Sequence, residues 1–571
     1  GCMAGFLPCV QTVPVILKDR GKSLRKGKKI AKKLNKQFVD IDEECEDNTQ
    51  RKATLSYITN TITIKNSEIA RLDAIEAFVD HCYNGPAAFK GDNETDIFGN
   101  LHLKTIGAIV RKCSKAYFYF LSNDEAQNIA GALNLQKDRR LRLMNENKPV
   151  IYIHARRDAN NEVFDHYSQY DGESQRMKIK IVDSSYLSVA TLKQDERTLP
   201  VNCVKIDQST GLVDSPFTSL IVGFGGTGQE AFKFLYEYSA FIGSDMKKSP
   251  FKCYAIDGEM NMIAGLVREK MPAIGEDELS LIQVAVDSEE FWDKVKAIIK
   301  ELNYVVIALN NDAIGLSLAV NLFKYALRNR PASQPMLKIL VRCYDNGNEK
   351  RMTEVTTSLN KSIEGNNVEI RLFGQEKNLY RCKTILSDDT LLEAMEFNKV
   401  YEKSELSAEE QWQKNFGEAE IQRLMTQKKM SRYHAIYDIN RRIAQNISNS
   451  LHSRTKMILM GFGENEQSER LRLYYGYANS RKDDTTKYDC GKDEKQLLLN
   501  IAMVEHERWI ASHKLMGYIY NTENDCVQKH HKCICSWDEL DEMTQSYDCN
   551  VVDTTIKMVY KKDGVLKRSY K

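Results

Sequence analysis

The sequence predicts an α/β protein in which two tandem domains, each a doubly wound parallel sheet, are followed by a mainly helical domain. Two observations carry this prediction: short apolar runs alternate with helical segments twice along the chain, and a glycine-rich turn joins one of these runs to a helix. With 571 residues, the chain is too long for a single hydrophobic core. The predicted domains span residues 1–208, 216–402 and 405–571.

Composition narrows the functional classes. Hydrophobic residues make up 42% and charged residues 28% of the chain, as in an ordinary globular protein. The formal net charge is only +2, so we expect no nucleic acid partner. The 14 cysteines lie in a long chain without a secretory signal, which predicts reduced thiols. No run of about 18 apolar residues is present. We therefore expect a cytoplasmic protein, and a place at the inner face of a membrane stays open.

The central segment has the clearest alternation. It contains six apolar runs, and three of the stretches between them have helical spacing. This alternation is typical of parallel strands covered on both faces by crossover helices. The runs are Ser219–Val222, Lys252–Ile256, Leu281–Val286, Tyr304–Leu309, Leu337–Val341 and Val368–Leu372, and the helical stretches are 229–238, 289–302 and 313–327. We expect one doubly wound sheet here.

The first domain repeats the later half of this pattern. Three apolar runs match the last three runs of the central segment in order and approximate spacing: Ala116–Leu121, Pro149–Ile153 and Met177–Val182. Phe38–Asp42 is a candidate earlier strand, but no glycine-rich turn precedes it, and residues 43–115 form a long insertion. We expect a degenerate copy of the central domain. Two unrelated α/β domains are the alternative.

A glycine-rich turn follows the first apolar run of the central segment and consists of Gly223, Phe224, Gly225, Gly226, Thr227 and Gly228. In a G-x-G-x-x-G turn, the first glycine allows the tight bend and the second lets the backbone approach a pyrophosphate. The third packs the helix close to the strand. Asp257 ends the next run, where a carboxylate can accept hydrogen bonds from a ribose. These residues predict a Rossmann-like nucleotide-binding domain. A turn needed only for packing is the alternative.

A second set of polar residues follows the fourth run, at the carboxyl edge where open α/β sheets bind ligands: Asn310, Asn311 and Asp312. Their side chains can contact a ribose or an adenine. Asn and Asp are also favoured as the N-cap of a helix, so a capping role is the alternative.

Residues for catalysis are missing from the central segment. It contains no histidine, because none lies between His166 and His434, and no G-x-S-x-G or Walker lysine motif is present. A dehydrogenase needs a positioned acid or base, so we expect no enzymatic activity. Five cysteines and histidines crowd into residues 526–535, but their spacing is not that of a structural zinc site, so we also expect no metal.

The central domain resembles the TrkA-N family, the nucleotide-binding core of RCK regulators of potassium transport. The resemblance rests on Val222–Gly228, Asp257 and the Asn-Asp after the fourth run. In the first domain, Asn123–Asn128 is similar to the D-D-x-x-N signature of that family. The resemblance implies that the protein binds NAD(H) or an adenine nucleotide. It also implies a homodimer that passes its ligand state to a membrane channel or transporter.

The final region contains an amphipathic helical pattern over Leu498–Tyr518. It resembles, at Val504–Trp509 and Met516–Tyr518, the RyR domain, a small helical module repeated in ryanodine receptors and found in bacteria beside TrkA-N domains. A carboxylate, an imidazole, a guanidinium and an indole within one helical stretch can grip a phosphorylated base. The candidate ligand residues are Glu505, His506, Arg508, Trp509 and Trp537. A structural network that holds the helix to its neighbours is the alternative.

These features predict a nucleotide-sensing regulatory protein. The expected output is control of a cation channel or transporter, of the potassium type, through ligand-dependent rearrangement of the domains. Two other functions stay open: an NAD(P)-dependent oxidoreductase, and a non-catalytic scaffold whose ligand sites have been lost.

Overall fold

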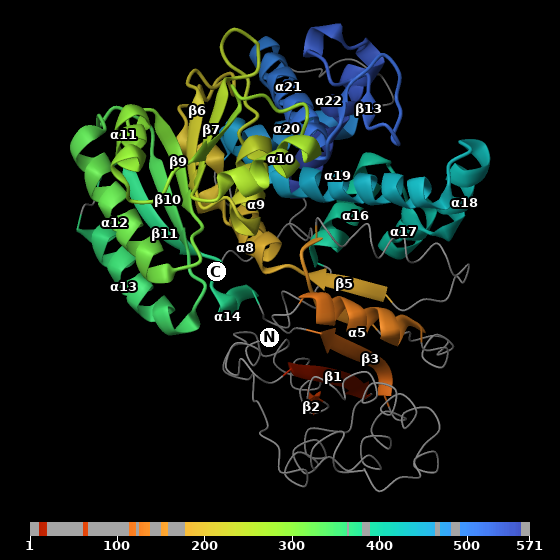
Figure 1. Cartoon of the computed structure of the whole chain (residues 1–571). Helices are drawn as coiled ribbons and strands as arrows, with labels where there is room; N and C mark the ends of the chain where they lie inside the picture. The colour runs from red at the N-terminus through yellow and green to blue at the C-terminus, as the bar shows by residue number, and fades with distance from the viewer. Residues whose placement is uncertain are drawn as a thin grey trace, which may run out of the picture. The chain divides into compact units, whose positions relative to one another are not determined.

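The computed structural model describes residues 11–19, 61–66, 113–120, 125–137, 150–157, 178–362, 365–379, 389–462, 469–480 and 491–560. The chain separates into two compact units (Figure 1). The first comprises residues 1–184 and 380–386, and the second comprises residues 185–379 and 387–571. The second unit therefore contains the whole predicted helical domain and all of the predicted central domain except residues 380–386.

The first unit is built on a mixed five-stranded sheet in the order β2-β1-β3-β4-β5. Its elements are β1 (Gln11–Asp19), β2 (Thr61–Asn66), β3 (Cys113–Phe120), α5 (Glu125–Lys137), β4 (Val150–His154) and β5 (Lys178–Val182). Strands β3, β4 and β5 pair in parallel, as the sequence predicts for the three matched runs.

The prediction of a fully parallel sheet was wrong for the first unit, because β1 runs antiparallel to both β2 and β3. The strand Thr61–Asn66 alternates threonine with isoleucine before it ends in Lys-Asn. This two-residue period is typical of an antiparallel strand with one buried face, so the signal was present within the supposed insertion. The candidate strand Phe38–Asp42 lies outside the described residues.

The second unit contains a six-stranded sheet in which every pairing is parallel, in the order β11-β10-β9-β6-β7-β8. Numbered along this sheet's own sequence and read from β8 to β11, the order is 3-2-1-4-5-6, the order of a doubly wound Rossmann-type sheet. The strands are β6 (Phe217–Val222), β7 (Phe251–Asp257), β8 (Leu279–Gln283), β9 (Leu302–Ile307), β10 (Leu337–Arg342) and β11 (Val368–Phe373). The α/β class and this parallel sheet are confirmed.

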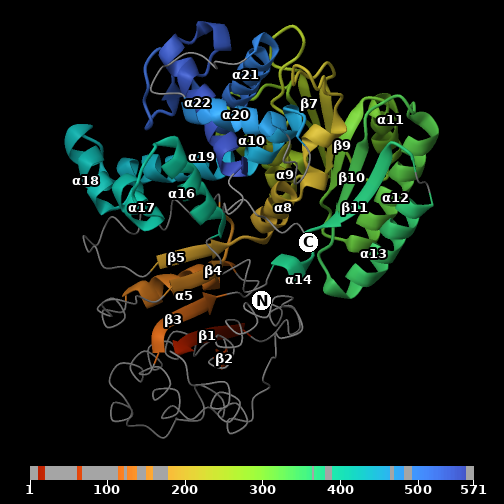
Figure 2. The same ribbon diagram turned by 180° about the vertical axis from the view of Figure 1, so that it is seen from behind.

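Both faces of this sheet are buried, but by different helices. Side chains that alternate along the strands divide into two cores, with Ile221 and Val306 in one and Val222 and Val305 in the other. The second core is closed by α11 (Glu289–Ile298), α12 (Asp312–Asn329) and α13 (Asn346–Lys361). The first is closed by α8 (Ser184–Gln194), α9 (Gly226–Tyr238) and α10 (Met260–Lys270). Figures 1 and 2 show the two layers on opposite sides of the strands.

The C-terminal part of the chain is helical and packs onto the α9 side of the sheet (Figure 2). We call residues 389–560 the helical region. Its elements are α16 (Asp389–Tyr401), α17 (Ala408–Phe416), α18 (Glu418–Gln427), α19 (Arg432–Leu459), α20 (Glu469–Ser480), α21 (Lys492–Leu515), β12 (Ile519–Tyr520), β13 (His530–His531) and α22 (Glu542–Tyr560). The short elements η3 (Glu196–Thr198), η4 (Pro200–Cys203), α14 (Glu376–Leu379) and η5 (Trp537–Glu539) complete the second unit.

The helical region and the sheet share one hydrophobic core. Buried residues of α9 such as Phe232 and Leu235 belong to the same cluster as Met457 of α19 and Val504 of α21. A continuous apolar core resists separation, because opening it would expose all of its buried surface to water. The predicted boundary near residue 402 therefore does not separate two independent compact bodies.

Candidate functional site

The glycine-rich turn lies at the carboxyl end of β6, where the strand order of the sheet reverses. Strand β6 pairs with β7 on one side and with β9 on the other. The connection after β6 leads through α9 to β7, and the chain later crosses back from β8 to β9. In open α/β sheets, ligands bind at this point, just beyond the carboxyl ends of the two central strands.

Two of the three motif glycines are required by the packing. Gly223 has a φ of +86°, and a Cβ built on it would lie 2.7 Å from the carbonyl oxygen of Ala308, the residue that follows β9. A Cβ on Gly228 would overlap the carbonyl oxygen of Gly223. The first and third glycines therefore perform the bending and close-packing roles that the sequence predicts.

The second glycine faces open space. A Cβ on Gly225 would meet no atom within 4 Å, and the φ of this residue is an ordinary −65°. Gly225 is exposed, and it is the N-cap of α9, with no side chain capping the helix. The fold therefore does not need glycine at this position, whereas an anion that approaches the first turn of α9 would need the space that it leaves.

Asp257 ends β7 and holds the glycine-rich turn. Its Oδ2 accepts a hydrogen bond from the backbone N–H of Phe224 at 2.7 Å, and its Oδ1 accepts one from Glu259 at 2.8 Å. Each carboxylate oxygen has a second lone pair, and the side chain is half-buried. Asp257 thus shapes the turn, and it retains acceptor capacity for a ribose hydroxyl.

The residues after β9 divide between structural and exposed positions. Asn311 caps α12, because its Oδ1 accepts from the N–H groups of Ala313 at 3.0 Å and Ile314 at 3.1 Å. Asp312 is buried and accepts from the N–H groups of Tyr344 and Asp345 in the loop after β10. Asn310 is exposed at the same edge. The capping alternative thus describes Asn311, and Asp312 anchors the neighbouring loop.

Sequence reasoning missed Ser185, Arg342 and Tyr344, which lie at this edge near the predicted residue Thr227. The Thr227 hydroxyl lies 3.1 Å from the Ser185 hydroxyl, and Arg342 Nη1 lies 3.5 Å from the same oxygen. The Arg342 guanidinium stacks on the Tyr344 ring at 4.0 Å from its centroid. The sequence did contain a signal for Arg342, since this residue ends a buried strand at the carboxyl edge of the sheet. It contained no signal for Ser185, which precedes the motif by about 40 residues and comes close to it only in the folded chain.

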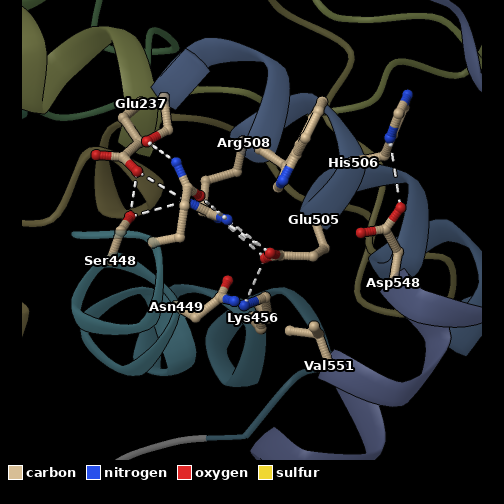
Figure 3. A network of polar contacts seen from close by, with 12 residues as sticks. Glu237, Ser448, Asn449, Lys456, Glu505, His506, Arg508, Asp548 and Val551 are labelled. Carbon is tan, nitrogen blue, oxygen red and sulfur yellow. Dashed lines mark hydrogen bonds and ion pairs between the residues drawn. The ribbon is translucent and has the colours of Figure 1, made fainter. Parts of the chain in front are cut away.

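The predicted residues of the helical region fall into two groups. Glu505 and Arg508 are fully buried and pair with each other at 2.8 Å, and their other partners are also protein side chains (Figure 3). His506, Trp509 and Trp537 belong to an aromatic cluster, in which the His506 ring stacks on Trp509 and meets Trp537 edge-on. For Glu505 and Arg508, the geometry is that of the structural alternative.

His506 and its neighbours hold α21 to α22. Its Nδ1 lies 3.3 Å from Asp548 Oδ2, and its Nε2 lies 2.9 Å from the Cys535 carbonyl oxygen. Burial lowers the pKa of His506, but the hydrogen bond to Asp548 and the charge of that carboxylate outweigh burial, so its pKa is raised. The protonated imidazole donates from both nitrogens, so the charged form fits these partners.

Comparisons with known proteins identify no relative, since no family model, curated protein or solved structure matches the chain. The described residues contain no group of three or more histidine, cysteine or acidic side chains arranged to hold a metal ion. Among the helices that the structure describes, none combines the length and the apolar character needed to cross a membrane.

Proposed function

We propose that this protein is a nucleotide sensor that binds NAD(H) or an adenine nucleotide at the glycine-rich turn. The observation that carries the proposal is the turn itself. Gly223 and Gly228 are required by packing, whereas Gly225 is left open at the first turn of α9. The sheet order places this opening at the switch point, and Asp257 stands at the end of the adjacent strand, where a ribose would lie.

Two further features favour sensing over turnover. The segment from β6 to β11 contains no histidine, and Asp257 and Asp312 are engaged with backbone N–H groups. Helix α9 also runs directly from the turn into the core shared with the helical region. By the TrkA-N resemblance, we propose a cation channel or transporter, of the potassium type, as the controlled partner, and a homodimer as the working assembly.

Thermal unfolding of the full chain tests this proposal. NAD, NADH, ATP, ADP and ADP-ribose would each be added at increasing concentration. A ligand at 100 times its dissociation constant stabilises a one-site protein by about 2.7 kcal/mol, which raises the unfolding temperature by several degrees. We expect one of these nucleotides to produce that shift. The absence of a shift with all five would refute nucleotide sensing and favour the scaffold alternative.

Nicotinamide turnover separates sensing from catalysis. If NADH binds, its absorbance is followed with added aldehydes, ketones and 2-oxo acids. A sensor leaves the reduced cofactor unchanged over many times the binding lifetime. Steady oxidation of NADH would support the oxidoreductase alternative, and the structure would then have to supply an acid or base.

A further inference from the structure

Helix α9 connects the glycine-rich turn to a buried network of charges. It begins at Gly226 inside the motif, and its last turn contains Glu237. At 1.5 Å per residue, its 13 residues span about 20 Å. Phe224 of the turn contacts Phe232 of α9 with ring centroids 6.3 Å apart. Residues 231–232 and 234–238 of α9 are buried, so the helix is packed against its surroundings from its middle to its last turn.

Glu237 lies where a helix disfavours negative charge. The carbonyl groups at a helix C-terminus carry partial negative charge, so an acid in the last turn is repelled rather than stabilised. Glu237 is also only 5% exposed, and burial of an unpaired carboxylate would cost several kcal/mol. Residues outside α9 must therefore hold this side chain in place.

Those residues come from two helices of the helical region. Arg508 of α21 places Nη1 2.8 Å from Glu237 Oε1, and the Ser448 hydroxyl of α19 donates to the same oxygen (Figure 3). Arg508 also contacts the Ser448 hydroxyl at 2.8 Å. A single carboxylate on α9 thus fixes both α19 and α21 against the helix that starts at the turn.

The network extends deeper into the helical region. Arg508 donates to Glu505 from Nη2 at 2.8 Å, and Lys456 of α19 lies 2.6 Å from Glu505 Oε2. Burial raises the pKa of Glu505, but Arg508 and Lys456 outweigh it, so the pKa is lowered. Two acids and two bases balance one another, and Lys456 and Arg508 have no exposed surface. Displacement of Glu237 would leave the two cations, Arg508 and Lys456, with a single carboxylate between them, and an uncompensated charge is costly in the protein interior.

We propose that the Glu237–Arg508 ion pair couples the glycine-rich turn to the helical region, so that nucleotide binding and the docking of α19 and α21 on α9 stabilise each other. This inference rests on the proposed function of the turn. It also changes the expected mechanism. The sheet and the helical region share one core. The ligand therefore strengthens the packing of α19 and α21 on α9, and the sheet and the helical region do not separate as independent domains. Binding linkage requires the effect to be reciprocal.

The variant Glu237→Gln tests the coupling, and Glu230→Gln is its matched control. Both residues are glutamates of α9, but Glu230 pairs with Lys233 of the same helix at 2.8 Å and makes no ion pair with the described residues of the helical region. Hydrogen exchange of the full chain would be measured with and without saturating NAD or ATP. Peptides over 223–230 report binding, and peptides over 445–456 and 500–512 report the helical region.

We expect nucleotide to slow exchange in both sets of peptides in the wild type and in Glu230→Gln. In Glu237→Gln, the turn should still be protected, whereas the protection of α19 and α21 should be lost and affinity should fall about fivefold or more. Equal protection of α19 and α21 in Glu237→Gln and Glu230→Gln would overturn the coupling while leaving nucleotide binding intact. If no nucleotide protects 223–230 in the wild type, the proposed function fails, and the coupling fails with it.

A milder variant covers the case in which Glu237→Gln does not fold. Ser448→Ala removes one partner of Glu237 and leaves the ion pair with Arg508. We expect it to weaken the nucleotide-dependent protection of α19 more than that of the turn itself. If the ratio of the nucleotide-dependent protection of α19 to that of the turn is the same as in the wild type, Glu237 is not the point of coupling.

Discussion

Asp257 accepts a hydrogen bond from the backbone N–H of Phe224 at 2.7 Å, so the end of one central strand fixes the turn that follows its neighbour. The residue predicted to bind a ribose is therefore also part of the framework of the glycine-rich turn. Its second oxygen is occupied by Glu259 N–H. A variant at Asp257 that abolishes binding would thus not distinguish a lost ligand contact from a collapsed turn.

Replacing Asp257 with alanine should destabilise the protein without any ligand. The substitution removes the acceptor for two backbone N–H groups, one of them on buried Phe224. An unpaired buried donor costs about 1–3 kcal/mol, and urea unfolding would measure the loss. Asp293→Ala is the control, because Asp293 is 63% exposed and pairs with Lys296 on the same helix. It should change the free energy of unfolding by about 0.5 kcal/mol or less. Equal effects of the two substitutions would contradict the framework role.

Removal of the central arginine of the buried network should be severely destabilising. Arg508→Met leaves Glu237 and Glu505 without their shared partner, and breaking a buried pair in this way costs about 3–5 kcal/mol. The double variant Glu237→Gln/Arg508→Met should be less destabilised than the sum of the two single variants, because the glutamine carries no charge to leave unpaired. Urea unfolding of all four proteins gives this interaction energy. Strict additivity would show that the two side chains do not interact.

Acid should destabilise the helical region through three histidines whose pKa is lowered by burial, two of them fully buried and His531 partly buried. Burial and then the charges of Lys456 and Arg508 lower the pKa of His452 well below 6.5, and burial and then Arg441 do the same for His513. Burial, followed by Arg441, lowers the pKa of His531 to about 4. A histidine whose pKa is lowered in the folded state contributes stability that is present above pH 6.5. This stability is lost as the pH falls from 6.5 toward the pKa of the folded state.

We therefore expect the free energy of unfolding to decrease between pH 6.5 and pH 4, with a smaller decrease in His531→Gln. His506 acts in the opposite sense, since its raised pKa gives stability that is lost as the pH rises through the folded-state value. Urea unfolding at several pH values would show both effects. Stability that rises on acidification below pH 6.5 would contradict the neutral state of the three lowered histidines.

Part of this fold could be predicted from the sequence because it depends on patterns within short segments of the chain. Continuous apolar runs between helical stretches indicate a buried parallel sheet, and the structure confirms six such strands. The antiparallel strands β1 and β2 were missed, although Thr61–Asn66 has the alternation of a half-exposed strand. The glycine-rich turn joins a strand to a helix as the sequence predicts, because Gly223 and Gly228 each meet a local steric demand.

The contacts that join distant segments could not be predicted in the same way. Glu237 meets Ser448 and Arg508 across more than 200 residues of sequence, and nothing around Glu237 marks it as a docking residue. A charged side chain in the last turn of an apolar helix was the only local hint, because such a residue is either exposed or paired at a distance. Only the packing of α9 against α19 and α21 decides between these two possibilities.

Calorimetric titration of nucleotide into Gly225→Val, beside Gly265→Val, tests the nucleotide site most directly. A Cβ at either glycine meets no atom within 4 Å, and neither position has a positive φ, so both variants should fold. Gly265 lies on the exposed side of α10, whereas Gly225 opens the first turn of α9. We predict that NAD or an adenine nucleotide binds the wild type and Gly265→Val alike and that Gly225→Val loses binding. Unchanged affinity in Gly225→Val would contradict a nucleotide site at this turn.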